Sequence, residues 1–323
     1  MRVRDVLVET SGQLAARGIP DSRIEAEVLL RHALRMDRAE FFANLDGCLE
    51  TAEEKLLSHI LLRRVQREPL SYILGQREFY GLDFAVTPDV LIPRQETELL
   101  VEKALEFCSA DRFKEGVAIA DVGTGSGAVA ISIAHNLPQA TLYATDISVD
   151  ALAVADANRR RHRLVERVHL GHGDLMGPVP FPVDVIVSNP PYIRTSEIAN
   201  LAPEIRLEPA GALDGGADGL DVVRRLLLQV PGHLRPEGCM LVEIAPEQLD
   251  PVMTLAGNIL TNAHVSFSKD LLGLPRVVGI EPGERLVPGK HRRCASGLNV
   301  FEKTVRRTQI HQEAFCGQRT AEA

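Results

Sequence analysis

From about residue 117 onward, short apolar runs alternate with segments of helical periodicity, and this alternation restricts the possible folds more than any other feature of the chain. Each apolar run has the length of a buried strand and ends at a turn-forming or polar residue. The four runs lie at residues 117–122, 141–145, 167–172 and 183–188. Helical patterns follow the first two, at 128–136 and 149–161. This alternation predicts an α/β fold in which a mostly parallel sheet carries helices on both faces.

The segments on either side of these runs complete the expected organisation. Ser22 to Glu25 and Thr51 to Glu54 both match the capping-box pattern that opens a helix, and Pro69 closes the second of these helices. Residues 78–86 predict two short strands that turn near Gly81. Beyond an irregular insertion, further elements are expected near 219–234, 240–244, 247–260, 264–268 and 275–280. The expected divisions are a helical bundle at 1–75, a hairpin linker at 76–95, an α/β domain at 96–285 and a basic tail at 286–323.

Charge is unevenly distributed along the chain. The net charge is −8, and residues 286–323 contain seven Lys or Arg and three Glu, so the remainder carries −12. A body that is so acidic is a poor binder of duplex DNA, because phosphate neutralisation supplies most non-specific affinity. The basic segment lacks helical or strand periodicity and is expected to be a solvated, disordered tail.

Three further features indicate a reducing, aqueous compartment. No apolar run approaches the ~20 residues that span a bilayer. The first residues alternate charges of both signs, without the apolar region of a signal peptide. The five cysteines are scattered, with no C-x-x-C pair that would indicate a zinc site or a disulfide framework. The protein is therefore expected to be cytoplasmic, to use no metal and to have no membrane partner.

A glycine-rich turn, Gly123-Thr124-Gly125-Ser126-Gly127, separates the first strand from its helix. Glycines allow a ligand to approach the main chain, and the helix N-terminus offers free N–H groups. Asp146 ends the second strand, where a carboxylate can accept hydrogen bonds from the hydroxyls of a ribose. The combination predicts a nucleoside-type cofactor without choosing one, since Gly123-x-Gly125-x-x-Ala128 also satisfies the dinucleotide pattern. A structural loop that binds nothing is the simpler alternative.

The fourth strand ends at Asn189-Pro190-Pro191-Tyr192. Two prolines cannot continue a strand, so the Asn189 amide is held at the carboxyl edge of the sheet, where open α/β sheets bind ligands. The Asn189 side-chain oxygen and the Pro190 backbone oxygen can each accept one N–H of a planar amino group, while the Tyr192 ring offers a flat face. This arrangement favours a pyramidal nitrogen with a free lone pair. A simple strand-ending turn is the alternative.

Together, these two motifs favour methyl transfer from S-adenosylmethionine over hydride transfer, which has no use for a clamp on an amino group. The methyl group of a sulfonium is already activated, so the enzyme must mainly aim a nucleophile at it. Arg94 and Thr97 stand where a loop becomes a helix. They are predicted either to cap that helix and form a surface ion pair or to form a wall of the pocket.

At this level of detail the chain resembles a known family, the HemK/PrmC-type glutamine methyltransferases of peptide chain release factors. The similarity rests on V-L-I-P-R-Q-E-T-E-L-L-V-E at 90–102, D-V-G-T-G-S-G at 121–127, D-I-S-x-x-A-L-x-V-A at 146–155, V-S-N-P-P-Y-I at 187–193 and A-L-D-G-G-x-D-G-L at 212–220. The resemblance implies a Rossmann-like, seven-stranded class I methyltransferase domain preceded by a helical bundle and a hairpin. It also implies transfer of a methyl group to N5 of the glutamine in the Gly-Gly-Gln loop of release factors.

The resemblance further assigns roles to residues. Gly123 to Gly127 and Asp146 would hold S-adenosylmethionine, Asp174 and Leu175 would flank its adenine, and Asn189 would lie beside it. The catalytic residues would be Asn189 and Pro190, and the substrate glutamine would be clamped by residues 189–192. Three residues, Gln95, Leu175 and Ala245, differ from those that the family usually carries.

Two other substrates stay open at the level of the sequence. One is a glutamine of another protein, such as a ribosomal protein, and the other is the N6 amino group of adenine in a nucleic acid, since adenine methyltransferases share N-P-P-Y. The acidic body disfavours the second, so no stable nucleic-acid partner is expected. The expected partners are release factors, and the protein is expected to be a monomer.

Overall fold

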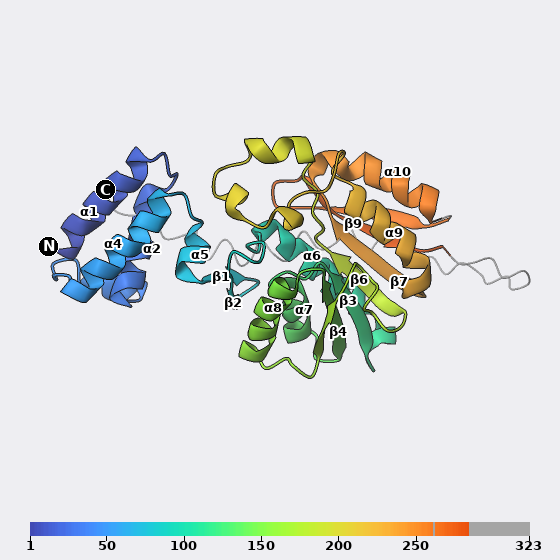
Figure 1. The fold of residues 1–323 in the computed structure, drawn as a ribbon. Coiled ribbons are helices and arrows are strands. Elements are labelled where there is room, and N and C mark those ends of the chain that lie inside the picture. The colour runs from blue at the N-terminus through green and yellow to red at the C-terminus, as the bar shows by residue number, and fades with distance from the viewer. Residues whose placement is uncertain (261, 284–323) are drawn as a thin grey trace, which may run out of the picture. The chain divides into compact units, whose positions relative to one another are not determined.

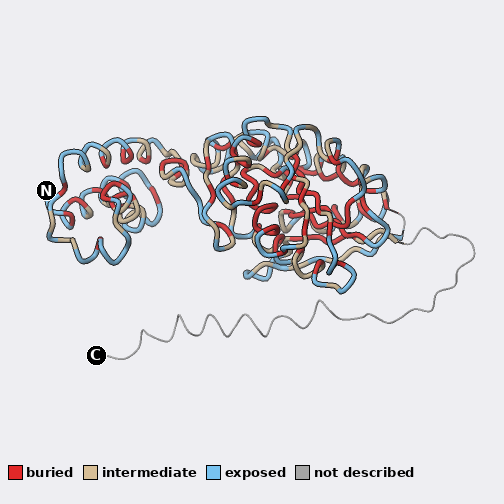
Figure 2. The backbone as a smooth tube through the Cα atoms, turned by 90° about the horizontal axis from the view of Figure 1, so that it is seen from below, coloured by how far each residue is buried: buried red, intermediate tan, exposed pale blue. Residues whose placement is uncertain are grey.

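The computed structural model describes residues 1–260 and 262–283, so the basic segment expected at 286–323 lies outside the described residues. The N-terminal part is helical, with a core of its own that is built from side chains such as Leu14, Leu29, Leu30, Phe41 and Ile60. Its helices are α1 (Val3–Ala16), α2 (Ser22–Leu34), α3 (Arg38–Ala43), α4 (Thr51–Val65) and α5 (Leu70–Leu74). Figure 2 shows buried residues along these helices and, as a second concentration, along the strands that follow.

The first predicted capping box is absent, and the second lies one residue earlier than predicted. Helix α2 begins after Asp21, which has a left-handed φ of 53° and whose side chain caps nothing, so Ser22 already lies inside the helix. Helix α4 begins one residue earlier than expected, because the Glu50 N–H donates to Glu53 Oε2 at 2.7 Å. A capping box that the sequence reading missed opens α3, where Asp37 Oδ1 accepts from the Glu40 N–H at 2.8 Å.

Two short antiparallel strands connect the helical part to the sheet. Strands β1 (Gln76–Phe79) and β2 (Leu82–Ala85) turn at Tyr80 and Gly81, as the sequence predicts. Their inward rings, Phe79 and Phe84, are almost completely buried and contact each other edge to face at 6.2 Å between ring centroids. The hairpin is therefore packed into the main core.

The main sheet has seven strands in the order β5-β4-β3-β6-β7-β9-β8. The strands are β3 (Val117–Val122), β4 (Ala140–Asp146), β5 (Val168–His172), β6 (Val183–Ser188), β7 (Leu234–Glu243), β8 (His264–Lys269) and β9 (Pro275–Glu281). Strands β3 to β7 are parallel to one another, and β9 pairs antiparallel with both β7 and β8. All six residues of β6 are buried, as a strand covered on both faces requires. The predicted α/β fold with a mostly parallel seven-stranded sheet is confirmed.

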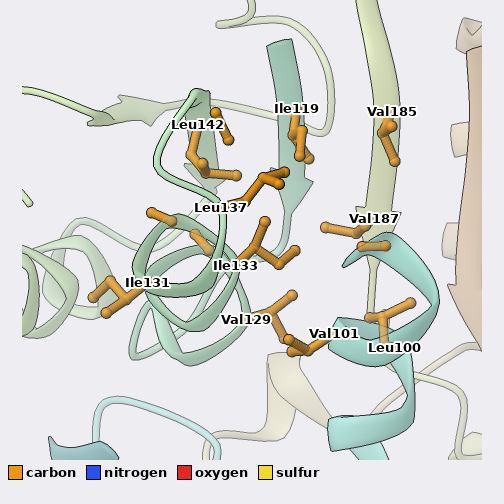
Figure 3. Packing of buried hydrophobic residues seen from close by; sticks show 14 of the residues in the cluster. Leu100, Val101, Ile119, Val129, Ile131, Ile133, Leu137, Leu142, Val185 and Val187 are labelled. Carbon is orange, nitrogen blue, oxygen red and sulfur yellow. The ribbon is translucent and has the colours of Figure 1, made fainter. Parts of the chain in front are cut away.

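Helices cover both faces of this sheet (Figure 1). Helices α6 (Glu98–Cys108), α7 (Ala128–Asn136) and α8 (Val149–Arg161) lie on one side, and α9 (Asp221–His233) and α10 (Leu249–Ile259) lie on the other. Figure 3 shows Val129 and Ile133 of α7, Leu100 of α6 and the strand residues Ile119 and Val187 gathered in one cluster. Among the described residues, no helix is both long enough and apolar enough to cross a bilayer.

The strand order creates one position where the chain reverses its direction of winding. From β3 the chain moves outward through β4 to β5, then returns to β6 on the other side of β3. Ligands of open α/β sheets bind at such a switch point, beyond the carboxyl ends of the strands. The glycine turn follows β3 and Asn189 follows β6, so both predicted motifs flank this position.

Candidate active site

The glycine turn after β3 has a backbone that only glycine adopts readily. Gly123, Gly125 and Gly127 have φ values of +75°, +55° and +81°. Apart from the adjoining residues, no heavy atom of the described part of the chain lies within 4 Å of a Cβ built on Gly123 or Gly125, so the space above the turn is open. A Cβ on Gly127 would instead approach Ile131 and Ala155 to 3.0 and 3.3 Å. The first two glycines thus leave room for a ligand, and the third allows α7 and α8 to approach the turn.

Two carboxylates hold this turn from either side. Asp146 Oδ2 accepts from the Gly125 N–H and Oδ1 accepts from the Ser148 N–H, each at 2.9 Å. Asp121 lies beneath the turn and accepts from the Thr124 hydroxyl at 2.6 Å and from the Ala130 N–H at 3.1 Å. Burial raises the pKa of Asp121 to about 6. The turn is therefore held in one shape by bonds from strands β3 and β4.

The side chains of Thr124 and Ser126 face into the protein. Both are buried, and the Thr124 hydroxyl is engaged by Asp121. The Ser126 carbonyl accepts from Asn158 Nδ2 at 2.8 Å, and the same Asn158 amide bonds the N–H and carbonyl of Ala85 in the hairpin. Any contact that these two predicted cofactor residues make with a ligand comes from their backbone.

Asp174 and Leu175 follow β5, two strands away from the glycine turn. Asp174 is exposed and forms an ion pair with Arg225 of α9. Leu175 has a left-handed φ of +49°, its carbonyl accepts from the Thr145 hydroxyl at 2.8 Å, and its side chain packs against the core. Both lie beyond the same edge of the sheet as Asp146, since Asp146 pairs with His172 of β5.

The clamp, which comprises residues 189–192, follows β6 and lies in a groove. Asn189 Nδ2 donates to the Thr97 hydroxyl at 3.0 Å. Within residues 1–260 and 262–283, neither Asn189 Oδ1 nor the Pro190 carbonyl oxygen accepts a hydrogen bond. The groove is lined by Leu91, Arg94, Asn189, Pro190, Tyr192, Ile193, Ile205, Ala212 and Leu213. Two acceptors on successive residues are thus available beside one groove.

The loop that carries Arg94 closes one side of the groove. Arg94 Nη2 donates to Glu208 Oε1 at 2.5 Å, and the Ile92 N–H donates to Glu208 Oε2 at 3.0 Å. Glu208 is buried, so this pair fixes the loop against the insertion that follows the clamp. The structure places Arg94 at the groove wall and Thr97 against Asn189.

A polar contact and two glycines fix the backbone of the clamp. Gln248 Nε2 donates to the carbonyls of Tyr192 and Gly219, at 3.0 and 3.1 Å. A Cβ on Gly219 would lie 2.4 Å from the Tyr192 oxygen, and one on Gly215 would lie 2.7 Å from the Pro191 oxygen. The tight approach explains why glycines occupy these positions. Burial also raises the pKa of Tyr192 to about 12, so its ring stays neutral.

Comparisons with known proteins agree with this geometry. A family model described as the PrmC N-terminal domain matches residues 5–75, and one described as the methyltransferase small domain matches residues 96–259. A release factor glutamine methyltransferase of Moorella thermoacetica is 46% identical over 79% of this chain and 90% of its own length. One from Geobacter sulfurreducens is 42% identical over 86% and 95%. The chain belongs to the release factor glutamine methyltransferase family.

A solved structure supports the fold of this family member independently. The catalytic domain of hMettl16 in complex with the MAT2A 3'UTR hairpin 6 superposes with a TM-score of 0.52. It is 14% identical in sequence, and the match covers 70% of this chain and 83% of that chain. At such low identity the likeness concerns the methyltransferase fold alone.

Four polar residues of this family member were not singled out from the sequence. Asp121, Glu208, Glu243 and Gln248 are all buried and all lie at or near the site. Asp121 begins the motif at 121–127, but the sequence alone assigns it no role. Glu243 ends an apolar strand, as Asp146 does, and that shared position could have marked it. Glu208 and Gln248 gave no such signal, because their partners are distant in the sequence.

Replacing Gln248 with alanine tests the support of the clamp in this family member. The Tyr192 and Gly219 carbonyls would lose their donor, and we expect the free energy of unfolding to fall by about 2–4 kcal/mol. Urea unfolding, monitored by circular dichroism, measures this change in the free energy of unfolding. Gln13→Ala, which removes an exposed contact with Glu9, is the matched control and should leave the free energy unchanged. Equal stability of Gln248→Ala and the wild type would contradict the assigned support.

Proposed function

We propose that the protein transfers a methyl group from S-adenosylmethionine to the side-chain nitrogen of the glutamine in the Gly-Gly-Gln loop of peptide chain release factors. Membership of the family supports the choice of substrate. The observation that carries the chemistry is the pair of available acceptors, Asn189 Oδ1 and the Pro190 carbonyl oxygen, beside one groove. The monomeric state and the cytoplasmic location expected from the sequence belong to the same proposal.

The clamp suits a primary carboxamide. Such an amide has two N–H donors in a plane, and each can be taken by one of the two acceptors. The nitrogen is a poor nucleophile while its lone pair is delocalised into the carbonyl. Hydrogen bonds that hold both N–H groups on one side favour a pyramidal nitrogen, which places the lone pair on the opposite side. Tyr192, which also lines the groove, offers a flat face to the amide plane.

The residues around the glycine turn fit the methyl donor. The open space above Gly123 and Gly125 admits a ligand close to the main chain, and the start of α7 supplies N–H groups at that point. Asp146 can accept hydrogen bonds from ribose hydroxyls, and Asp174 and Leu175 lie where an adenine would extend. When bound, S-adenosylmethionine supplies an activated methyl group on a positively charged sulfur.

The contribution of the chain to the reaction is mostly orientation and electrostatics. Holding two reactants in line can supply ~7–11 kcal/mol of a barrier in the best cases. As the amide nitrogen gives its lone pair to the methyl carbon, the carbon–sulfur bond would break and the donor would leave as a neutral thioether. Positive charge develops on the nitrogen until it loses one proton to solvent, and until then its N–H groups are stronger donors. The two fixed acceptors therefore bind the transition state more tightly than the ground state.

Radiolabelled S-adenosylmethionine with three separate acceptors tests this proposal. We expect label on a purified release factor, no label on the same factor with the Gly-Gly-Gln glutamine replaced by alanine, and no label on DNA. Ribosomal proteins serve as a fourth arm, since they could carry an alternative glutamine. Label on DNA or on ribosomal proteins, with none on the release factor, would overturn the proposal.

A further inference from the structure

Glu243 is a buried acid that the proposed mechanism does not yet use. It ends β7 beside β6, and the register pairs Val242 with Ser188, the residues that precede Glu243 and Asn189. Its side chain is 1% exposed, and its Oε2 atom has no hydrogen-bond partner among the described residues. A buried carboxylate oxygen without a partner is destabilising, so its presence at a site calls for a functional explanation.

The Glu243 carboxylate is connected to the clamp through one residue. The Thr97 side chain lies beside the carboxylate and lowers its pKa, and Thr97 Oγ1 accepts from Asn189 Nδ2 at 3.0 Å. Thr97 is 4% exposed, so water has little access to this hydroxyl. The three side chains thus form a continuous path from the buried end of β7, through the residue that precedes α6, to the half-buried Asn189.

The direction of these hydrogen bonds follows from where the protons are. An ionised carboxylate can only accept, so the single hydroxyl proton of Thr97 must point to Glu243. The Thr97 oxygen can then only accept, and it must receive an N–H from Asn189. This requirement selects one of the two amide orientations of Asn189, which have nearly the same shape and differ mainly in hydrogen bonding. In the selected orientation, Oδ1 is left to accept from the substrate.

We propose that Glu243 and Thr97 are positioning residues that set the orientation of the Asn189 amide, so that its oxygen faces the substrate nitrogen. The inference rests on the proposed function, since it concerns how the same clamp is prepared. If Glu243 is protonated, it can donate to Thr97, and the Thr97 hydroxyl can then donate to Asn189 Oδ1. In this reversed orientation, an N–H of the Asn189 amide faces the N–H groups of the substrate. Two hydrogen-bond donors that face each other repel.

The groups around Glu243 bring the pKa of its carboxyl close to neutral pH. Burial raises the pKa of Glu243 to about 7, and Glu96 acts in the same direction. The Thr97 hydroxyl and the positive charges of Arg276 and Arg94 act against that shift. Arg276 is engaged by Asp270 at 3.2 Å and Arg94 by Glu208, so neither neutralises Glu243 directly. Tyr192, the remaining titratable neighbour, is itself neutral in this range.

Substitutions at both residues test the proposal through turnover. In a wild-type assay with saturating release factor and S-adenosylmethionine, kcat is expected to rise about tenfold between pH 6 and pH 8. Glu243→Gln should lower kcat about tenfold at pH 8 and remove most of this rise, because an amide can donate or accept. Thr97→Val should also lower kcat about tenfold, and Thr97→Ser should restore it. The dissociation constant of S-adenosylmethionine should stay within twofold in all three.

Matched controls separate this effect from a general loss of stability. Glu237→Gln changes an exposed acid of the same strand, and Thr10→Val changes a buried threonine of α1; both should behave as the wild type. Wild-type kcat in Thr97→Val, or an unchanged pH dependence in Glu243→Gln, would overturn the positioning role. Those results would leave the proposed methylation intact, since the wild type would still be active.

A readout that does not depend on activity completes the test. The side-chain NH₂ resonances of Asn189, assigned by their loss in Asn189→Ala, should shift between pH 6 and pH 8 in the wild type. They should be insensitive to pH in Glu243→Gln. Resonances that do not move in the wild type would overturn the positioning role, even if no methylation of release factors were found.

Discussion

Asn189→Ala is expected to lower kcat for release factor methylation about 10³-fold and to leave the affinity for S-adenosylmethionine within a few-fold of the wild type. The substitution removes one of the two acceptors that orient the substrate nitrogen and that stabilise the charge developing on it. Loss of a single such group typically lowers kcat ~10²–10³-fold. Here the group also orients the nucleophile, which places the effect at the upper end. Single-turnover methylation and calorimetric titration of the cofactor measure the two quantities.

Asn200→Ala is the control for Asn189→Ala, because Asn200 is an exposed asparagine of the insertion that follows the clamp. It should have wild-type kcat. Asn189→Asp is a second informative variant, since it keeps the shape and an acceptor but cannot donate to Thr97. Because either oxygen of the Asp side chain can accept from the substrate, it should retain more turnover than Asn189→Ala. Turnover by Asn189→Ala within tenfold of the wild type would remove Asn189 from its proposed role.

The sequence predicted the sheet well because burial dictates its pattern. Strand β6 is buried on both faces, so its centre is the apolar run Val185 to Val187, and the two prolines after the strand mark its end. The short helices α3 and α5 were not predicted. They are stabilised by tertiary contacts, such as the burial of Phe41 and the hydrogen bond from the Tyr72 hydroxyl to the Val90 carbonyl at 2.6 Å. Helices of six and five residues are too short to show a helical periodicity in the sequence.

The helix starts were misplaced for a related reason. Ser22 and Thr51 are good capping residues by type, but in the structure each is already the first residue of its helix, and the cap position is one residue earlier. Which of several neighbouring polar residues caps a helix depends on where packing fixes the chain. At Asp21 this leaves a left-handed backbone instead of a side-chain cap. Local propensity is therefore a weak guide to the boundary, although the helices themselves were predicted.

For the site, the sequence located groups that lie close together along the chain. The glycine turn and residues 189–192 are continuous motifs, and Asp146 follows from its place at the end of a strand. The supporting residues are different, because each bond joins distant positions. Gln248 reaches Tyr192 across 56 residues, and Glu208 reaches Arg94 across 114. A single sequence contains no signal for such pairs, so the clamp was predicted without the groups that hold it.

The predicted role of Thr97 changes most in the light of the structure. At the level of the sequence it was a helix cap or part of a pocket wall. The structure shows that its side chain caps no helix, and that its hydroxyl contacts Asn189 instead. A residue that precedes a helix by sequence can therefore serve a strand end that lies 92 positions away. This contact is what connects the clamp to Glu243 in the proposed arrangement.

Asp146→Ala is expected to weaken S-adenosylmethionine binding about 100-fold and to leave kcat at saturating cofactor within a few-fold of the wild type. The carboxylate would accept hydrogen bonds from the ribose hydroxyls. Hydrogen bonds to charged groups contribute ~1.5–3 kcal/mol each to the free energy of binding. It also holds the Gly125 and Ser148 N–H groups, so Asp146→Asn, which keeps an acceptor, should be milder. Isothermal titration calorimetry gives the dissociation constant, and the exposed Asp150→Ala on α8 is the control. An unchanged constant in Asp146→Ala would exclude the ribose contact and would move the cofactor away from the end of β4.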